Sequence, residues 1–214
     1  EVFHERWKNV DRKTAEIAYQ NYNFVNKTIL LHGNDINVQS LIDLLLVNHK
    51  KFNVIQLISH QDKFGKEQAA ILASKGVDVK VIDDAGVGKF LPEIDVVLLG
   101  CEIIMHETFI VKTGAHIIAA AANFYKIPVY VLADSRKLLN KKYFPQSVLD
   151  TLIGSEEKSS SVIWKNPPQN VEVIFNHIEE VPNKLVDKFI LEKEALDSVE
   201  LIDKIDKVLV ANFF

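Results

Sequence analysis

The sequence predicts an α/β fold, a three-layer sandwich in which helices cover both faces of a mainly parallel sheet. Short runs of Ile, Val and Leu alternate with segments of helical spacing over much of the first 134 residues. The segments between them are short, as in successive strand–helix–strand units. The apolar runs are continuous rather than alternating, which is typical of strands buried on both faces.

The first part of this pattern predicts three strands and two helices. The run KTILLHG is apolar and ends in glycine, which indicates the first strand, at 27–33. The segment from 38 to 50 has apolar residues at helical spacing, and a strand at 52–59 follows it. The next helix, at 65–76, ends at Gly76, which suits a left-handed cap. A strand at 77–83 completes this part.

The second part continues with a short helix or turn at 84–94 and a buried strand at 95–100. A loop then leads to an alanine-rich helix at 114–128, which stops before Pro128 because the residue preceding a proline disfavours helical dihedrals. The run VYVLAD at 129–134 predicts the fifth strand. Ile117, Ile118, Ala121 and Ala122 of the alanine-rich helix are interpreted as core or subunit interface.

The two ends of the chain are less regular. Residues 1–25 are predicted to be a helical N-terminal remnant, and residues 26–214 to form the α/β domain. Residues 152–170 are polar, rich in serine and contain proline, so a long loop is expected. A strand is predicted at 171–178, and two helical stretches at 181–209.

Composition excludes several classes of function. The net charge of −4 gives no electrostatic reason to expect nucleic acid or a membrane as partner. No apolar run approaches the roughly 18 residues of a membrane-spanning helix. A single cysteine rules out an internal disulfide and fits a reducing compartment, so we expect the cytoplasm. The chain begins with Glu and its only methionine is Met105, so we expect that part of the natural N-terminus is missing.

Ligands of open parallel sheets lie beyond the carboxyl ends of the strands. Four segments are therefore candidates: 32–35, 59–65, 83–88 and 100–107. The GVG at 86–88 follows the third strand and lacks the full dinucleotide fingerprint, and the P-loop pattern is absent. His60, His106 and His116 lack the spacing of metal ligands, so neither a metal nor a cofactor is expected.

Three groups in or near these segments are capable of chemistry, each with a structural alternative. Cys101 follows a strand end, but the adjacent Glu102 works against a thiolate, and lone cysteines are commonly small buried apolar residues. His32 could act as a base, although a hydrogen-bonded loop histidine fits its neighbours better. Lys112 could hold a phosphate together with the start of the alanine-rich helix, or be a solvated lysine.

The ordered set of motifs resembles the regulatory α, β and δ subunits of translation initiation factor 2B. These subunits are related to methylthioribose-1-phosphate isomerase and ribose-1,5-bisphosphate isomerase. The family's "ILTHG" is similar to ILLHG at 29–33, and its "D.A.....M..VD.VLVGAD" is similar to residues 83–102. Its "NG.V.NKIGT..LA..A....VP.YV" and "DYVPPELVDLFIT" are similar to residues 106–131 and 179–191. The resemblance covers about 28–191 in unbroken order and implies a Rossmann-like sheet domain.

The departures from the family pattern fall on the isomerases' functional residues. Their cysteine after the first strand is replaced by Gly33, and their aspartate after "GA" by Glu102. Cys101 falls on the family's alanine, and His60 replaces the arginine of "ETRP". Because the isomerase route needs thiol and carboxylate together, the resemblance implies an emptied site. We expect a vestigial ligand pocket, with no catalytic residue, lined by Gly33, Asn34, His60, Glu102, Lys112 and Gly114.

The resemblance implies a non-enzymatic, regulatory subunit of the guanine nucleotide exchange factor for initiation factor 2. Its expected partners are homologous subunits, the α subunit of the initiation factor and a small sugar-phosphate effector. Residues 133–158 look most like the β subunit, and the δ subunit is the nearest alternative. The alternative is an aldose–ketose isomerase with a rearranged site that uses Glu102 with Cys101 or His32.

Overall fold

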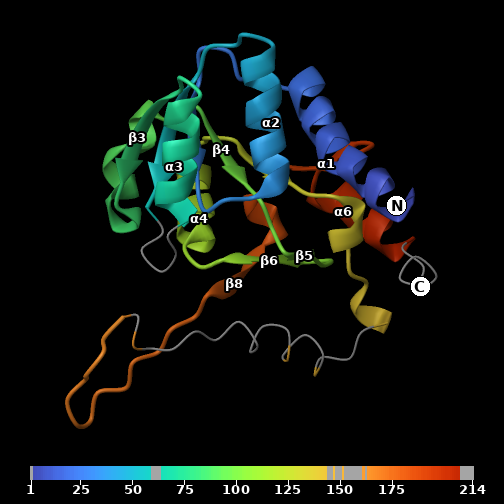
Figure 1. The fold of residues 1–214 in the computed structure, drawn as a ribbon. Helices are drawn as coiled ribbons and strands as arrows, with labels where there is room; N and C mark the ends of the chain where they lie inside the picture. Colours follow the sequence, from blue (N-terminus) through green and yellow to red (C-terminus); the bar gives the residue numbers. More distant parts are fainter. Residues whose placement is uncertain are drawn as a thin grey trace.

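The computed structural model describes residues 2–58, 64–143, 147, 151, 161 and 163–207 (Figure 1). It confirms the α/β fold with a mainly parallel sheet and a helix at the N-terminus. The main sheet has seven strands in the order β10-β9-β7-β4-β1-β2-β3, all parallel except β10. Their bounds are β1 Thr28–Leu31, β2 Asn53–Leu57, β3 Asp78–Ile82, β4 Val96–Leu99, β7 Val129–Leu132, β9 Lys188–Ile190 and β10 Ala195–Leu196.

Helices cover both faces of this sheet, as the two-sided burial of its strands requires. Helices α1 (Val2–Asn21), α2 (Ile36–Val47) and α3 (Phe64–Ser74) pack on one face. Helices α4 (Ala115–Phe124) and α6 (Ser198–Asp206) pack on the other. Successive residues of β1 alternate between the two cores, with Ile29 in the first and Leu30 in the second, and both are fully buried.

Most predicted elements of the main sheet occur within a few residues of their expected limits. The turn at 84–94 is two short 3₁₀ helices, Asp84–Lys89 and Leu91–Glu93. Gly76 has φ of +82°, which confirms the left-handed cap at the end of α3. Helix α1 contributes Ala15 and Ala18 to the core, and the domain boundary at residues 25 and 26 stays a prediction.

A second, three-stranded antiparallel sheet is absent from the sequence-based prediction. It has the order β5-β6-β8, with β5 at Ile103–Ile104, β6 at Thr108–Lys112 and β8 at Ile178–Pro182. The sequence predicts a loop at this place, but Thr108–Lys112 form β6. The strand predicted at 171–178 is wrong, because pairing with β6 begins only at Ile178.

The first helical stretch predicted after residue 181 is also wrong, because that segment forms β8, β9 and β10. Phe189 and Ile190 are both fully buried, on opposite faces of the main sheet. Consecutive buried apolar residues have the same appearance in a short buried strand and in a buried helix. The second stretch is confirmed as α6, which begins at an Asp197 capping box.

Candidate functional site

The candidate site lies where the order of the main sheet reverses. From β1 the chain adds β2 and β3 on one side, and then places β4 and β7 on the other. The segments that follow β1 and β4 therefore diverge at the carboxyl ends of two adjacent strands. Open parallel sheets bind ligands at such a point.

Asp35 and Gly100 bring these two segments into contact. Asp35 is the N-cap of α2, and its Oδ1 accepts hydrogen bonds from the backbone N–H of Asn37 at 2.8 Å and of Val38 at 3.4 Å. A Cβ added at Gly100 would overlap the Cβ and Cγ atoms of Asp35. Glycine is therefore required at position 100, because the Asp35 side chain occupies the space of any larger residue.

Lys137 joins a third strand end to this contact. It lies in a short 3₁₀ helix, Ser135–Lys137, directly after β7. Its Nζ donates a hydrogen bond to the backbone oxygen of Cys101 at 2.5 Å and lies 3.4 Å from Oδ2 of Asp35. Burial lowers the pKa of Lys137, but the neighbouring Cys101, together with the negative charges of Asp35, Glu102 and Asp134, outweighs it and the pKa is raised. Lys137 is therefore a charged tie between the ends of β1, β4 and β7.

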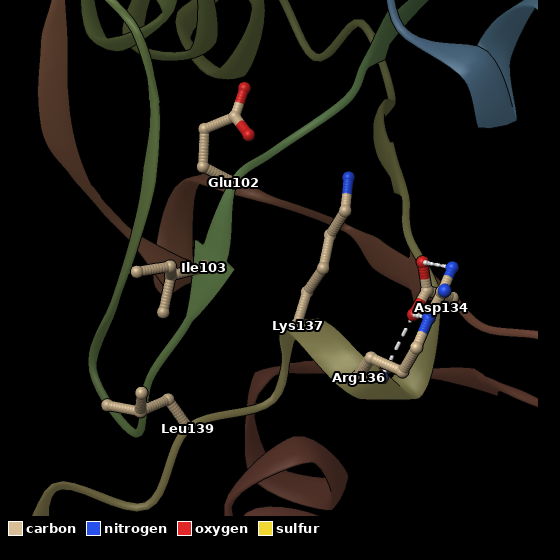
Figure 2. Close-up of a pocket in the computed structure, with 6 residues that line it drawn as sticks. All are labelled: Glu102, Ile103, Asp134, Arg136, Lys137 and Leu139. Atoms are coloured by element: carbon tan, nitrogen blue, oxygen red, sulfur yellow. Dashed lines mark hydrogen bonds and ion pairs between the residues drawn. The ribbon is translucent and has the colours of Figure 1, made fainter. Parts of the chain in front are cut away.

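A cavity of about 340 Å³ opens beside this lysine, lined by Glu102, Ile103, Asp134, Arg136, Lys137 and Leu139. Figure 2 shows the Glu102 and Lys137 side chains extending in the same direction, while Arg136 pairs with Asp134. The carboxylate of Asp134 accepts bonds from Nε of Arg136 at 2.6 Å and from Nη2 at 2.9 Å. Burial, and then the charge of Asp134, raise the pKa of Asp11 in α1.

Cys101 lies in the core rather than in the cavity. Its side chain is 2% exposed and packs with apolar residues of the core on the α4 side of the main sheet. Burial raises the pKa of the thiol, so it stays protonated at neutral pH. This agrees with its interpretation as a small buried apolar residue.

Three of the predicted pocket residues lie next to one another. Gly33 has φ of +72°, and a Cβ there would lie 3.3 Å from Cδ of Lys112. The Lys112 ammonium lies 4.1 Å from the centre of the Phe64 ring. Gly114 has φ of +110°, and its Cβ would lie 3.1 Å from Nε2 of the buried His32.

The other predicted residues are placed differently. Glu102 lines the cavity beside Lys137, and Asn34 is exposed in the loop after β1. His60 lies outside the described residues. His106 is not among the residues that line the cavity, and it pairs with Asp206 of α6 at 3.0 Å.

The start of α4 binds a carboxylate of its own chain. The Oε1 atom of Glu179 in β8 accepts hydrogen bonds from the backbone N–H of Gly114 at 2.8 Å and of His116 at 2.9 Å. These are two of the N–H groups that a bound phosphate would use. The sequence gives no signal for this contact, because Glu179 is 65 residues from Gly114.

The described part of the chain contains neither a grouped metal site nor a membrane-spanning helix. Within the ranges that the structure describes, no three His, Cys, Asp or Glu side chains are grouped as a metal site would need. Within the same ranges, no helix has the length and apolar character to cross a membrane.

Comparisons with known proteins agree with the fold. The family model described as "Initiation factor 2 subunit family" matches residues 1–198. The solved structure of eIF-2B from Pyrococcus horikoshii is 25% identical and superposes with a TM-score of 0.76, covering 91% of this chain and 66% of that one. 5-Methylthioribose 1-phosphate isomerase from the same organism, at 16% identity and TM-score 0.77, covers 94% and 61% and shows the fold alone.

Curated relatives include both translation factors and an enzyme. The eIF2B subunit alpha of Dictyostelium discoideum is 36% identical over 126 residues, or 58% of this chain and 39% of the relative. Ribose 1,5-bisphosphate isomerase of Methanocaldococcus jannaschii is 27% identical over 168 residues, or 77% and 53%. The eIF2B subunit beta of Schizosaccharomyces pombe is 26% identical over 187 residues, or 85% and 47%. The chain thus spans about half or less of each, and the likeness to the β subunit in particular stays a prediction.

Proposed function

The chain belongs to the initiation factor 2 subunit family, and from that premise we propose that it is a non-catalytic, regulatory subunit of the guanine nucleotide exchange factor for translation initiation factor 2. It acts in the cytoplasm by recognition rather than by turnover. The sheet domain assembles with homologous subunits, and the assembly binds the α subunit of the initiation factor.

The observation that carries this proposal is Gly33. The resemblance to the isomerases puts their cysteine at this position, and acid–base work on a sugar by their route needs that thiol with a carboxylate. The nearby thiol, that of Cys101, is buried and protonated. Restoring a cysteine at 33 would put a side chain on a residue with φ of +72° and against Lys112. One substitution therefore does not rebuild the site.

The tie made by Lys137 supports the same conclusion. Its ammonium bridges the Cys101 carbonyl and Asp35 at the switch point of the sheet, where a substrate would lie. An enzyme needs preorganised polar groups that are aimed at the charge that develops in the transition state. Here the positive charge is used within the chain.

Co-purification tests the proposal. A tagged copy expressed in the source cells should recover other initiation factor 2B subunits and initiation factor 2, identified by mass spectrometry. Recovery of neither, from cells in which both are detected, would contradict the proposed role. Stabilisation of the purified protein by a sugar phosphate in a thermal-shift assay would support an effector in the remaining cavity, and a flat response would count against one.

The isomerase remains a second candidate because Glu102 keeps a carboxylate beside the cavity and the charged Lys137. An assay with ribose 1,5-bisphosphate and methylthioribose 1-phosphate separates the two. We expect no turnover above that of the buffer. Turnover that the variant Glu102→Gln abolishes would overturn the non-catalytic proposal.

A further inference from the structure

The face of α1 that packs on the main sheet contains a charged residue. Thr14, Ala15 and Ala18 lie on this face at helical spacing, and each is at most 1% exposed. Asp11 lies one turn before Thr14 and extends the same stripe. Its Oδ1 atom is buried and accepts no hydrogen bond from any residue that the structure describes. Such burial is costly, because the hydrogen bonds to water that the oxygen loses are not replaced.

The course of α1 across the sheet places Asp11 beyond the end of β7. The hydroxyl of Thr14 donates a hydrogen bond to the carbonyl of Ala133 at 3.2 Å, directly after that strand. About two turns later in α1, the ring of Tyr22 lies 4.5 Å from that of Tyr130, within the strand. Helix and strand therefore run in opposite directions. The residues that precede Thr14 in α1 consequently lie over the segment that follows β7.

A second carboxylate, that of Asp134, is buried in the segment after β7. It accepts hydrogen bonds from the backbone N–H of Arg136 at 3.0 Å and from its guanidinium at 2.6 and 2.9 Å (Figure 2). Glu192, which follows β9, accepts hydrogen bonds from the N–H of Ser135 at 2.9 Å and from its hydroxyl at 2.5 Å. Donors at the end of β7 are thus engaged by Asp134 and Glu192, and Asp11 adds a further acid to this group.

Asp11 therefore meets charges of both signs. Burial and then the charge of Asp134 raise its pKa, and the charge of Asp35 at the start of α2 raises it further, while Arg136 and Lys137 lower it. The raising effects are larger, so the docked helix holds a proton on Asp11 more tightly than a free helix does. By linkage, protonation of Asp11 strengthens the docking of α1.

We propose that α1 is a proton-sensitive latch, a helix that packs loosely on the main sheet while Asp11 is ionised and tightly once Asp11 is protonated. The inference goes beyond the proposed function, because it holds for a regulatory subunit and for an isomerase alike. Asp134, Arg136 and Lys137 also line the cavity at the switch point. The position of α1 and the charge in that cavity therefore depend on each other.

The sign of the pH dependence follows from the raised pKa of Asp11. The contribution of its proton to docking is fully present below the ordinary value of 3.8 and is lost as pH rises through the docked pKa. The ionised state, and with it the looser packing of α1, is thus the state of higher pH. Asparagine at position 11 has nearly the shape of the protonated acid and is uncharged at every pH, so Asp11→Asn should pack tightly throughout.

Hydrogen exchange of the α1 amides, corrected for the intrinsic rate at each pH, tests the latch. At pH 7 we expect protection factors over residues 12–21 to be about threefold or more higher in Asp11→Asn than in wild type. The difference should shrink as pH falls towards 4, because wild-type Asp11 then gains its proton. Glu16→Gln is the matched control. It makes the same change of acid to amide in the same helix, at a side chain that is 40% exposed, and should give no gain in protection.

Two results would overturn the inference. The first is protection of α1 in Asp11→Asn that does not exceed that of the wild type at pH 7. The second is a gain of the same size at pH 7 and pH 4, which would show that the shape of asparagine acts rather than its lack of charge. An NMR titration of the Asp11 carboxyl carbon in the wild type needs no stable variant. A midpoint at or below 3.8 would contradict the latch, and a higher midpoint would support it.

A double-mutant cycle tests the link between α1 and the strand ends. Lys137→Met removes one of the two positive charges that offset Asp11. Protection of α1 should therefore fall more when Lys137→Met is made in the wild type than when it is made in Asp11→Asn. The cycle cancels the loss that Lys137→Met causes through its own contacts. Equal losses in the two backgrounds would overturn the dependence of α1 on the charge at the end of β7.

Discussion

Replacing Lys137 with methionine removes the charged tie at the switch point and keeps most of the volume of the side chain. The Lys137 side chain is 20% exposed and that of Asp35 is 18% exposed, so solvent screens the pair only in part. The change leaves the Cys101 carbonyl without this donor. Asp35 keeps its hydrogen bonds to the start of α2.

The expected loss in the free energy of unfolding is about 2 kcal/mol. A hydrogen bond to a charged group contributes roughly 1.5–3 kcal/mol, and breaking a fully buried pair costs about 3–5 kcal/mol. Asp35 keeps its hydrogen bonds to the start of α2, and a methionine at position 137 does not carry the desolvation cost of a cation. The lower of the two energy ranges therefore applies. In a domain of this size, 2 kcal/mol corresponds to a fall in Tm of roughly 4–8 °C.

Urea unfolding across a range of pH tests the reasoning. The pKa of Lys137 is raised above its ordinary value of 10.5 in the folded state, so its contribution is fully present below that value and is lost as pH rises through the folded pKa. The difference between wild type and Lys137→Met should be constant from pH 6 to 9 and shrink above about pH 10.5. A variant as stable as wild type at pH 7, or a difference that grows in alkali, would refute the account of the tie.

Three further expectations concern single positions. Gly100→Ala should lower the free energy of unfolding by roughly 1–3 kcal/mol or more, because its Cβ would overlap Asp35. The control is Gly88→Ala, whose Cβ would have nothing within 4 Å and which should change urea unfolding little. The Cys101 thiol should react with a thiol reagent only after urea is added, and labelling of the folded protein would contradict its burial. The Thr28 N–H and the Lys27 ammonium hold the pKa of Asp95 below its ordinary 3.8, so its stabilisation is present above that pH and lost as pH falls through the folded pKa. Asp95→Asn should therefore reduce the loss of folding stability between pH 5 and pH 2, measured by circular dichroism. A loss as steep as that of the wild type would refute the assignment.

The sequence predicts those elements of the fold that have a recognisable local pattern of apolar residues. β1, β4 and β7 are mostly apolar runs, β2 is apolar apart from Asn53 and Gln56, and each occurs where it is expected. The second sheet depends on pairs between strands far apart in the chain, such as Val111 with Glu179, and β5 has only two residues. No periodicity can reveal a strand of that length.

The residues of the candidate site also divide into those that the sequence predicts and those that depend on contacts far apart in the chain. The resemblance places Gly33, Lys112 and Gly114 in one pocket; in the structure Gly33 lies against Lys112 and Gly114 against His32, and the pocket itself stays a prediction. The resemblance missed Lys137 and Glu179, whose roles rest on contacts such as that between Lys137 and Asp35 across 102 residues. A lysine after a strand has the appearance of a solvated residue until its partners are known.

The second sheet has a consequence for the continuity of the chain. β8 is held by five residue pairs to β6 and by the Glu179 cap on α4, while β9 lies between β7 and β10. The residues that follow the segment 163–176 thus supply an integral part of both sheets and of the core. A protease cut within that segment should release neither piece, and the two fragments should migrate as one particle until a denaturant separates them. The covalent link across that segment is therefore needed to deliver the last thirty or so described residues to the fold, and not to keep them there.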